Sequence, residues 1–447
     1  MTRFPSNFTL FRGALAGALL GLCLPVPADT LPLPSAGNDV VGELRVVLAR
    51  QEDTLSDIAR RYNLGYSEIT DANPTVDPWL PGEGTPILLP TQFILPDAPR
   101  QGIVINIATM RLFYYPPARK DESATVVTHP IGIGKEGWST PVGATQVISK
   151  QKDPIWTVPA SIREEHARKG EPLPAVVPAG PDNPLGKHAF RLGLPGYLIH
   201  GTNKPYGIGM RVSHGCIHLY PEDIAALFDR IPPGIPVTIV NQPFLAGWRD
   251  GTLYMEAHKP LEEELKAWEG NLTPAIKVVS RVTGDNKAAV EWGRVIRLTR
   301  RGHGFPVPIS PGSPSLDELL AALPVIEPEQ DKDSALEVKD ASSSSSGSSA
   351  EAMNDSRSSQ ERAPNNRQWY VQAGSFKTMD KAHRIAALLR HLGPPIPARH
   401  VAAQGGYRVL AGPFGDKNEA QEHLRRIQSQ LGLDAFIRVP AAGSRIN

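Results

Sequence analysis

The chain has 447 residues, and its 47 Lys and Arg against 46 Asp and Glu give a formal net charge of +1. This balance creates no strong field to attract nucleic acid, so the sequence predicts no nucleic-acid partner. The length allows two or three domains, and 44 prolines with 40 glycines favour a loop-rich, sheet-containing protein over a helical bundle.

The first 28 residues have the pattern of a cleavable export signal. Arg3 and Arg12 precede a short apolar run, Gly13 to Leu24, and the small residues of Val26-Pro27-Ala28 fit cleavage after Ala28. The apolar run is about a dozen residues long, which is short for a bilayer span. We therefore expect a signal peptide over 1–28 and no stable membrane insertion, with a retained anchor as the alternative.

The number and positions of the cysteines limit the roles that Cys216 can have. Cys23 raises the alternative of a lipoprotein signal, but Leu22 stands where such signals need a small residue. Signal cleavage would leave Cys216 as the only cysteine of the mature chain. Structural cysteines of exported proteins come in pairs, and structural zinc sites recruit several ligands. Cys216 is therefore expected to be a free thiol, either inert and buried or reactive.

Residues 39–93 are expected to form a small α+β unit. The stretch "RVVLARQEDTLSDIARRYNLGYSEITDANP" opens with a β-type run, continues with a helix pattern after Asp53-Thr54, and has a second short helix that ends at Pro74. "GTPILLP" reads as a closing strand. This order resembles a LysM module, which implies binding of glycans that contain N-acetylglucosamine. A packing domain without a ligand is the alternative.

Residues 100–241 are expected to form a mainly-β domain. "GIVINIATMRLFYYP", "ATVVTHPIGIG", "GATQVISK", "YLIHG" and "PVTIV" are short β-type runs, and they are separated by long loops rich in Gly and Pro. A mixed extension follows over 242–310. A Pro- and Ser-rich linker over 311–366, including "DASSSSSGSSAEAMNDSRSS", is expected to be disordered because it has too little apolar surface to bury.

Residues 367–441 contain an internal repeat. The two similar halves are "WYVQAGSFKTMDKAHRIAALLRHL" and "YRVLAGPFGDKNEAQEHLRRIQSQL". Each half predicts a strand, a turn and an amphipathic helix. The resulting β-α-β-β-α-β order resembles a SPOR domain, which implies binding of glycan strands stripped of their peptides. The residues that match this family's two motifs are Val371, Gln372, Gly374 and Phe376, and Gly412-Pro413-Phe414. An RNA-binding domain is the alternative, although the strands lack its aromatic and basic signature.

Three histidines surround Cys216 in "YLIHGTNKPYGIGMRVSHGCIHLYPEDI". If the backbone from Arg211 to Leu219 is extended, His214, Cys216 and His218 project to one face. A thiol that attacks an acyl group needs a base and backbone N–H groups that hold the oxyanion. His200, at the end of an apolar strand-like run, is a candidate base. A buried structural role is the alternative for any single histidine.

The spacing of these residues resembles a known signature. His200-Gly201-Thr202 followed by Ser213 to Ile217 is similar to the L,D-transpeptidases of the YkuD family, and the likeness extends over residues 40–260. The resemblance implies a multidomain chain in which a YkuD-type β-sandwich carries catalysis. It is strongest to periplasmic enzymes of Gram-negative bacteria that join a LysM-like module to this domain.

The resemblance also implies the reaction. Cys216 would attack the carbonyl on the L-centre of diaminopimelate in a tetrapeptide stem, expel D-Ala and form a thioester. An amine would then accept the acyl group, either another stem's diaminopimelate or the terminal Lys of an outer-membrane lipoprotein. The site residues would be His200 as base and acid, His214 and Gly215 at the oxyanion site, Ser213 at the motif's hydroxyl position, and Tyr206 on the donor-site loop. No metal or cofactor is required.

His218 departs from the family pattern, which commonly has Arg or Asn at that position. Arg is always charged and binds carboxylates through two hydrogen bonds, whereas His is mostly neutral near pH 7. One hypothesis is that donor turnover rises as the pH falls through the pKa of His218.

Other functions remain open at this point. The same thioester could pass to water, as in an L,D-carboxypeptidase, or a related amidase could release a lipoprotein. A wall-binding adaptor without catalysis would use only the LysM-like and SPOR-like ends. A papain-like peptidase is disfavoured because that family places its cysteine before its histidine. The expected partners are peptidoglycan stems and glycan strands, and the expected location is the periplasm with enrichment at the division septum.

Overall fold

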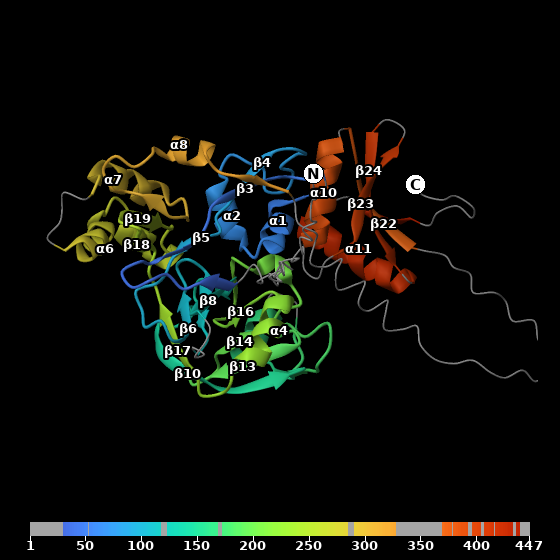
Figure 1. Cartoon of the computed structure of the whole chain (residues 1–447). Helices are drawn as coiled ribbons and strands as arrows, with labels where there is room; N and C mark the ends of the chain where they lie inside the picture. The colour runs from blue at the N-terminus through green and yellow to red at the C-terminus, as the bar shows by residue number, and fades with distance from the viewer. Residues whose placement is uncertain are drawn as a thin grey trace, which may run out of the picture.

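The structure, a computed structural model, describes residues 30–327 apart from 52, 118–122, 169–171 and 285–289, and residues 369–438 apart from 378, 392–395, 404–405, 415 and 432–434. The expected signal peptide lies outside this range. Figure 1 shows the main sheet below, the LysM-like elements above it, the extension on one side and the C-terminal domain on the other. No helix in the described part of the chain is long and apolar enough to cross a membrane.

A mixed, nine-stranded sheet forms the body of the central domain. Across the sheet its strands are β1 (Thr30–Pro32), β8 (Thr125–Pro130), β7 (Arg111–Tyr115), β6 (Gly102–Asn106), β17 (Pro236–Val240), β10 (Gly143–Lys152), β13 (His188–Leu192), β14 (Leu198–His200) and β16 (Ile217–His218). Ile103 and Ile105 of β6 pack into one buried cluster, whereas Val104 packs into another. Because both faces of β6 are covered, its apolar run is continuous. The prediction of a mainly-β domain is confirmed.

Short elements surround the last strands of this sheet. They are β9 (Ile133–Gly134), β11 (Trp156–Thr157), α3 (Ala160–Arg168), β12 (Val176–Val177), the 3-10 helix η1 (Pro205–Gly207), β15 (Arg211–Ser213) and α4 (Pro221–Arg230). α4 begins with Pro221, whose fixed φ suits the first turn of a helix. Its buried residues include Ile224 and Leu227, which belong to the central core.

The LysM-like module has the predicted β-α-α-β order: β3 (Arg45–Leu48), α1 (Leu55–Arg61), α2 (Tyr66–Ala72) and β4 (Pro86–Leu89). Thr54 caps α1 in a reciprocal capping box with Asp57, which accounts for the helix start at this point. Leu55 and Ile58 of α1 pack in the same cluster as Val104 and Phe113 of the central sheet. The module and the outer face of the sheet therefore share one hydrophobic core.

The segment directly after the expected cleavage site joins the central sheet. Strand β1 pairs antiparallel with β8, and Thr30 lies opposite Val127. Farther along, β2 (Val40–Gly42) pairs with β5 (Gln92–Ile94). The sequence did not predict these strands, because three residues are too few to show a period.

The extension after residue 242 has a core of its own. It contains β18 (Phe244–Arg249), β19 (Thr252–Ala257), η2 (Glu262–Glu264), α5 (Leu265–Trp268), α6 (Thr273–Thr283), α7 (Trp292–Arg301) and β20 (Val307–Pro308). Met255, Val279 and Leu298 are buried together from three of these elements. Leu44, just before β3, and Leu88, within β4, belong to the same cluster, so the extension also packs against the LysM-like module.

The first part of the expected linker over 311–366 contains regular structure, contrary to the prediction. Helix α8 (Leu316–Ala321) is capped by Ser315 and Glu318, and β21 (Val325–Ile326) pairs in parallel with β3. A capping box and strand pairing stabilise this segment despite its polar composition. Residues 328–366 lie outside the described range.

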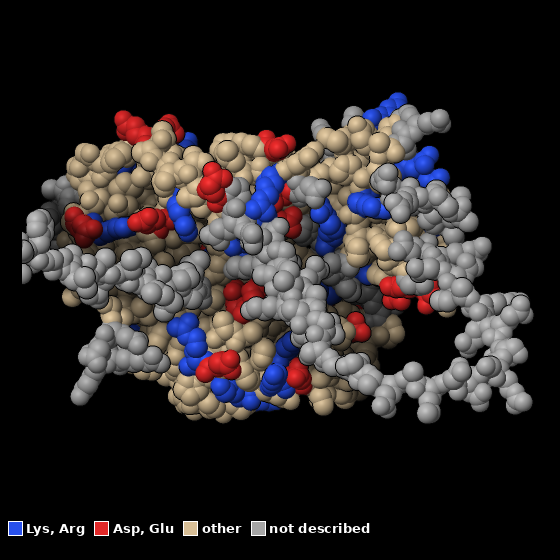
Figure 2. Space-filling model, turned by 45° about the vertical axis from the view of Figure 1, so that its right-hand side comes forward, with Lys and Arg blue, Asp and Glu red and all other residues tan. Residues whose placement is uncertain are grey.

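The C-terminal domain has the predicted β-α-β-β-α-β order. Its elements are β22 (Trp369–Phe376), α10 (Met379–His391), β23 (Ala398–Ala403), β24 (Gly406–Phe414), α11 (Lys417–Leu431) and β25 (Phe436–Arg438). β22 and β24, the opening strands of the two repeats, pair antiparallel at the centre of a four-stranded sheet. Figure 2 shows acidic and basic side chains interspersed over the visible face rather than gathered by sign.

Candidate active site

Strands β14 and β16 bring the signature residues together. They pair in parallel, with Ile199 beside Ile217 and His200 beside His218. Cys216 precedes Ile217, so the register sets it level with Leu198, two residues before His200. Parallel neighbours lie about 4.8 Å apart. His200 and Cys216, sixteen positions apart in sequence, therefore lie near each other on neighbouring strands at one sheet edge.

The motif is a turn between two short strands and not one extended strand. β15 pairs with β9, whereas β16 pairs with β14, and the break falls at His214 to Cys216. Gly215 has φ +100°, a conformation that other residues rarely adopt. The prediction that His214, Cys216 and His218 share one face depends on an extended backbone, and the positive φ at Gly215 interrupts the alternation between His214 and Cys216. Cys216 and His218 both follow this break.

Two hydroxyl groups fix this turn. Ser213 Oγ donates to the Cys216 carbonyl oxygen at 2.6 Å, and Thr140 Oγ1 donates to the Gly215 carbonyl oxygen at 2.9 Å. A side chain at Gly215 would place its Cβ 3.0 Å from the Tyr197 ring. These contacts hold the backbone beside the thiol in one conformation.

The thiol of Cys216 is partly buried. Its Sγ lies 3.8 Å from the carbonyl oxygen of Gly196, in the turn between β13 and β14. Burial raises the pKa of Cys216 above its ordinary value. The thiol is therefore protonated near neutral pH and needs a base before it can act as a nucleophile.

His200 is suited to be that base. Its side chain is buried, and its Nδ1 lies 2.5 Å from the carbonyl oxygen of Gly201. A carbonyl only accepts, so Nδ1 carries the hydrogen and the lone pair is on Nε2. Burial lowers the pKa of His200 to about 4, which keeps the imidazole neutral at physiological pH.

We predict that Cys216 and His200 form a neutral pair in the free protein. Iodoacetamide should therefore alkylate Cys216 slowly at pH 7, and the rate should rise as the pH increases through the raised pKa of the thiol. A mass-spectrometric time course over pH 5 to 10 measures this. A fast rate that is already constant at pH 5 would instead indicate a preformed thiolate–imidazolium pair.

His214 contacts residues that the sequence analysis did not identify. Its Nε2 lies 3.0 Å from Oε2 of Glu165 on α3 and 3.1 Å from Nζ of Lys135, and Lys135 reaches Oε1 of Glu165 at 2.5 Å. The Trp138 ring packs edge-on at a centroid distance of 4.8 Å. Burial lowers the pKa of His214, and Lys135 lowers it further. The turn is therefore tied to the loop that carries α3.

Arg211, just before the motif, anchors the turn to the extension. Its guanidinium pairs with Glu262 and, at 2.6 Å, with Oε2 of Glu263, both in η2. Its Nε also donates to the Gly134 carbonyl oxygen at 3.1 Å. Nothing in the sequence signature indicates that a segment fifty residues downstream supports the site.

His218 is a packing partner of His200. Only 4% of its surface is exposed, and the two rings stack at a centroid distance of 6.1 Å and an angle of 20°. Burial lowers the pKa of His218 to about 3, and the neighbouring His200 lowers it as well. His218 thus stays neutral at physiological pH. The burial and neutral state of this ring disfavour the hypothesis that turnover follows titration of His218 against a substrate carboxylate.

Tyr206 lies in η1, on the loop between His200 and Cys216. It is half-buried, and burial raises its pKa to about 12, so the phenol stays protonated. Among the described residues, no group of three or more His, Cys, Asp and Glu side chains could hold a metal ion.

Family comparisons match three parts of the chain. Residues 100–239 match the L,D-transpeptidase catalytic domain (YkuD), residues 49–78 match the LysM domain, and residues 365–438 match the SPOR domain. All three correspond to the sequence predictions, in the predicted order.

Comparisons with individual proteins agree. The chain is similar to the "Probable L,D-transpeptidase YcfS" of Escherichia coli, at 47% identity over 59% of this chain and 82% of that protein. It is similar to the "Probable L,D-transpeptidase YbiS" of the same organism at 45% identity, over 62% of this chain and 90% of that protein. The "Probable L,D-transpeptidase ErfK/SrfK" of Salmonella typhimurium is 42% identical over 65% of this chain and 94% of that protein.

Proposed function

The chain belongs to the L,D-transpeptidase family, and from this premise we propose that it transfers peptidoglycan stem peptides through a thioester on Cys216. The observation that supports the proposal most directly is the register of β14 and β16, which brings a buried neutral imidazole to the same sheet edge as a partly buried thiol. The 42–47% identity to relatives named L,D-transpeptidases supports the reaction class.

In the first half-reaction, Nε2 of His200 takes the proton of Cys216 as sulfur attacks the carbonyl on the L-centre of diaminopimelate. A carbon–sulfur bond forms, and the carbon–nitrogen bond to the terminal D-Ala breaks. The proton held by His200 passes to the leaving amine. Backbone N–H groups of the turn at His214 to Cys216 stabilise the oxyanion, and the contacts of Ser213 and Thr140 preorganise that turn.

In the second half-reaction, an amine attacks the thioester, and His200 removes its proton. The carbon–sulfur bond breaks, and the proton returns to sulfur. We propose two acceptors, the diaminopimelate of another stem, which gives a 3-3 cross-link, and the terminal Lys of an outer-membrane lipoprotein. Both are primary amines, so both need a base that removes a proton from the attacking nitrogen.

Incubation of the purified protein with tetrapeptide muropeptides, with and without a lipoprotein C-terminal peptide, tests this function. Mass spectrometry distinguishes three products: cross-linked dimers, stems linked to the lipoprotein peptide, and the tripeptides that hydrolysis gives. We expect release of D-Ala together with one of the two amide products. Release of D-Ala with water as the sole acceptor would identify an L,D-carboxypeptidase, and no consumption of the tetrapeptide would contradict the thioester mechanism.

We further propose that the SPOR domain directs the enzyme within the periplasm, to denuded glycan at the division septum. The domain adds a second binding site on the same chain, which raises the local concentration of the catalytic domain near that glycan. Deletion of residues 367–447 is expected to disperse a septal fluorescent fusion without lowering activity in vitro. A deletion variant that remains at the septum would contradict this role.

A further inference from the structure

The LysM-like module contacts the loop that lies between His200 and Cys216 in the chain. The contact is made by the corner between α1 and α2, residues 62–67, here called the α1–α2 corner. The N–H of Tyr66 donates to the carbonyl oxygen of Ile208 at 3.0 Å. The N–H and the hydroxyl of Ser67 both donate to the carbonyl oxygen of Gly209, at 3.2 and 2.6 Å.

The two backbones approach so closely that only glycine fits on either side. A Cβ on Gly65 would lie 2.7 Å from Cα of Gly209, and a Cβ on Gly209 would lie 2.3 Å from the nitrogen of Tyr66. Gly209 also has φ +79°, which disfavours other residues. The N–H groups of the first turn of α2 have no partner within their own helix, and the loop carbonyls satisfy them.

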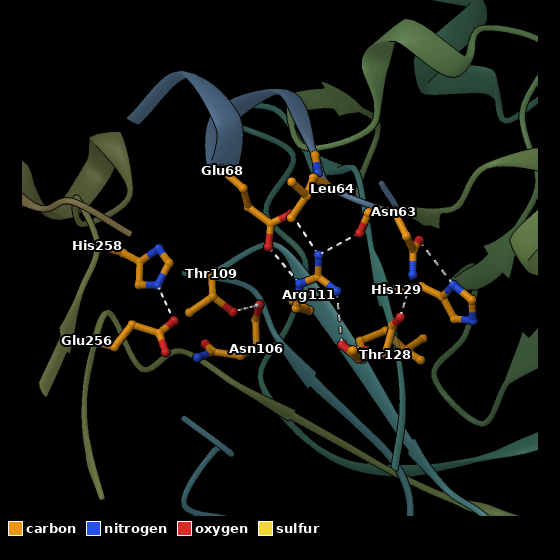
Figure 3. Close-up of polar contacts among 12 residues, drawn as sticks. Asn63, Leu64, Glu68, Asn106, Thr109, Arg111, Thr128, His129, Glu256 and His258 are labelled. Carbon is orange, nitrogen blue, oxygen red and sulfur yellow. Dashed lines mark hydrogen bonds and ion pairs between the residues drawn. The ribbon is translucent and has the colours of Figure 1, made fainter. Parts of the chain in front are cut away.

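The same corner holds the chain on the other side of the motif. The hydroxyl of Tyr220, immediately before α4, donates to the carbonyl oxygen of Leu64 at 3.1 Å. Arg60, at the end of α1, pairs with Glu222 of α4 through Nε at 2.9 Å and Nη2 at 3.1 Å. Figure 3 shows Asn63 and Leu64 of the corner beside Arg111 of the central sheet. Arg111 donates to the Asn63 carbonyl oxygen at 2.8 Å.

A short path leads from the corner to His200. The loop carbonyls of Ile208 and Gly209 are held by α2, and Gly207, two residues earlier, lies against the ring of His218. Gly132 also lies against that ring, since a Cβ there would meet the imidazole at 2.1 Å. His218 in turn stacks on His200 at 6.1 Å. Ser67 is half-buried at the start of this path, and Gly209, Gly207, His218 and His200 are all buried.

We propose that the α1–α2 corner of the LysM-like module is a positioning element of the active site, and that Ser67 acts as a positioning residue for His200 through Gly209, Gly207 and His218. The module therefore has a role in the reaction that is separate from glycan binding. This inference rests on the proposed function, in which His200 is the base.

Ser67→Ala tests the inference. Loss of the hydroxyl removes one of the two donors to Gly209, so the loop relaxes and His200 becomes more accessible to water. We expect kcat to fall about tenfold with KM unchanged, because small displacements of a catalytic group cost rate more than binding. The pKa of His200, measured by NMR titration of its ring proton and assigned with His200→Gln, should rise toward the ordinary histidine value. His218, which stacks on this ring, is unchanged in the variant.

Three further variants make the test specific. Thr70→Ala in the same helix is the matched control, since the Thr70 hydroxyl bonds only to carbonyls of α2 itself, and it should change neither quantity. Ser67→Thr retains the hydroxyl and should therefore have the kcat and the His200 pKa of the unmodified protein. Gly65→Ala, which forces the two backbones apart, should act in the same direction as Ser67→Ala and more strongly.

A folded Ser67→Ala protein with the kcat and the His200 pKa of the unmodified chain would overturn the inference, even if its melting temperature were lower. Failure of Gly65→Ala to fold would leave Ser67→Ala to decide. If the unmodified protein itself transferred no stem peptide, the proposed function would fail, whereas the NMR titration would still test the structural coupling.

Discussion

Cys216→Ala is expected to reduce D-Ala release and acyl transfer by a factor of about 10⁴ or more, because the variant has no atom that can form the thioester. The partly buried thiol contributes only a small apolar volume, so the fold should be retained. The measurement is the initial rate of tetrapeptide consumption by mass spectrometry, together with a search for the covalent acyl adduct. That adduct should be present in the unmodified protein and absent from Cys216→Ala.

The chain offers a matched control for this experiment. Cys23 is the other of its two cysteines. Cys23→Ala in a full-length preparation should leave the rate of tetrapeptide consumption unchanged. Cys216→Ser retains a hydroxyl but not the acidity of a thiol, so it should be much slower than the unmodified protein. A Cys216→Ala protein that still forms a covalent adduct with the stem peptide would refute the assignment of the nucleophile.

Glu68→Ala is expected to destabilise the protein by about 3–5 kcal/mol, since it leaves the charge of Arg111 buried without a partner. The pair joins α2 to β7 through Nε–Oε1 at 2.6 Å, and the two side chains are only 1% and 5% exposed. Arg111 also packs 4.1 Å from the Phe93 ring and donates to Thr128 Oγ1 at 3.1 Å. Figure 3 shows this guanidinium enclosed by partners from the module and the sheet.

The same helix provides the control. Asp71 pairs with Lys259, but those side chains are 23% and 66% exposed, so Asp71→Ala should change stability by less than about 1 kcal/mol. Urea unfolding followed by tryptophan fluorescence measures both variants. The double variant Glu68→Leu with Arg111→Met should recover much of the loss, because it removes both charges. Equal midpoints for Glu68→Ala and Asp71→Ala would show that the buried pair does not stabilise the interface.

The sequence predicts those features that depend on local patterns. The repeated strand–turn–helix in the C-terminal domain specifies its β-α-β-β-α-β order, because each half carries its own periodicity and turn residues. The sequence could predict a pairing of Cys216 with His200 because the expected export signal would leave one cysteine in the mature chain, with few other roles for it. The helices of the LysM-like module were predicted for a similar reason, since Asp53-Thr54 precedes an apolar helix pattern and Pro74 ends the second helix.

Features that depend on contacts distant in sequence could not be predicted. Glu165 is 49 residues from His214, and Lys135 is 79 residues from it, so no local pattern connects them. Alternation along a strand assumes a continuous strand, and the positive φ at Gly215 separates His214 from Cys216 and His218, which both follow it. Strand β21 was missed because two residues that complete another sheet carry no period of their own.

The shared core between the LysM-like module and the central sheet has a consequence for how such chains can be rearranged. Removal of this module would expose Val104, Phe113 and the charge of Arg111, so we do not expect it to be exchanged as an independent unit. The SPOR domain encloses a separate core, formed by residues of its own sheet and helices. Gain, loss or replacement of domains in this architecture should therefore take place at the C-terminal junction, and the N-terminal module should be inherited together with the catalytic domain.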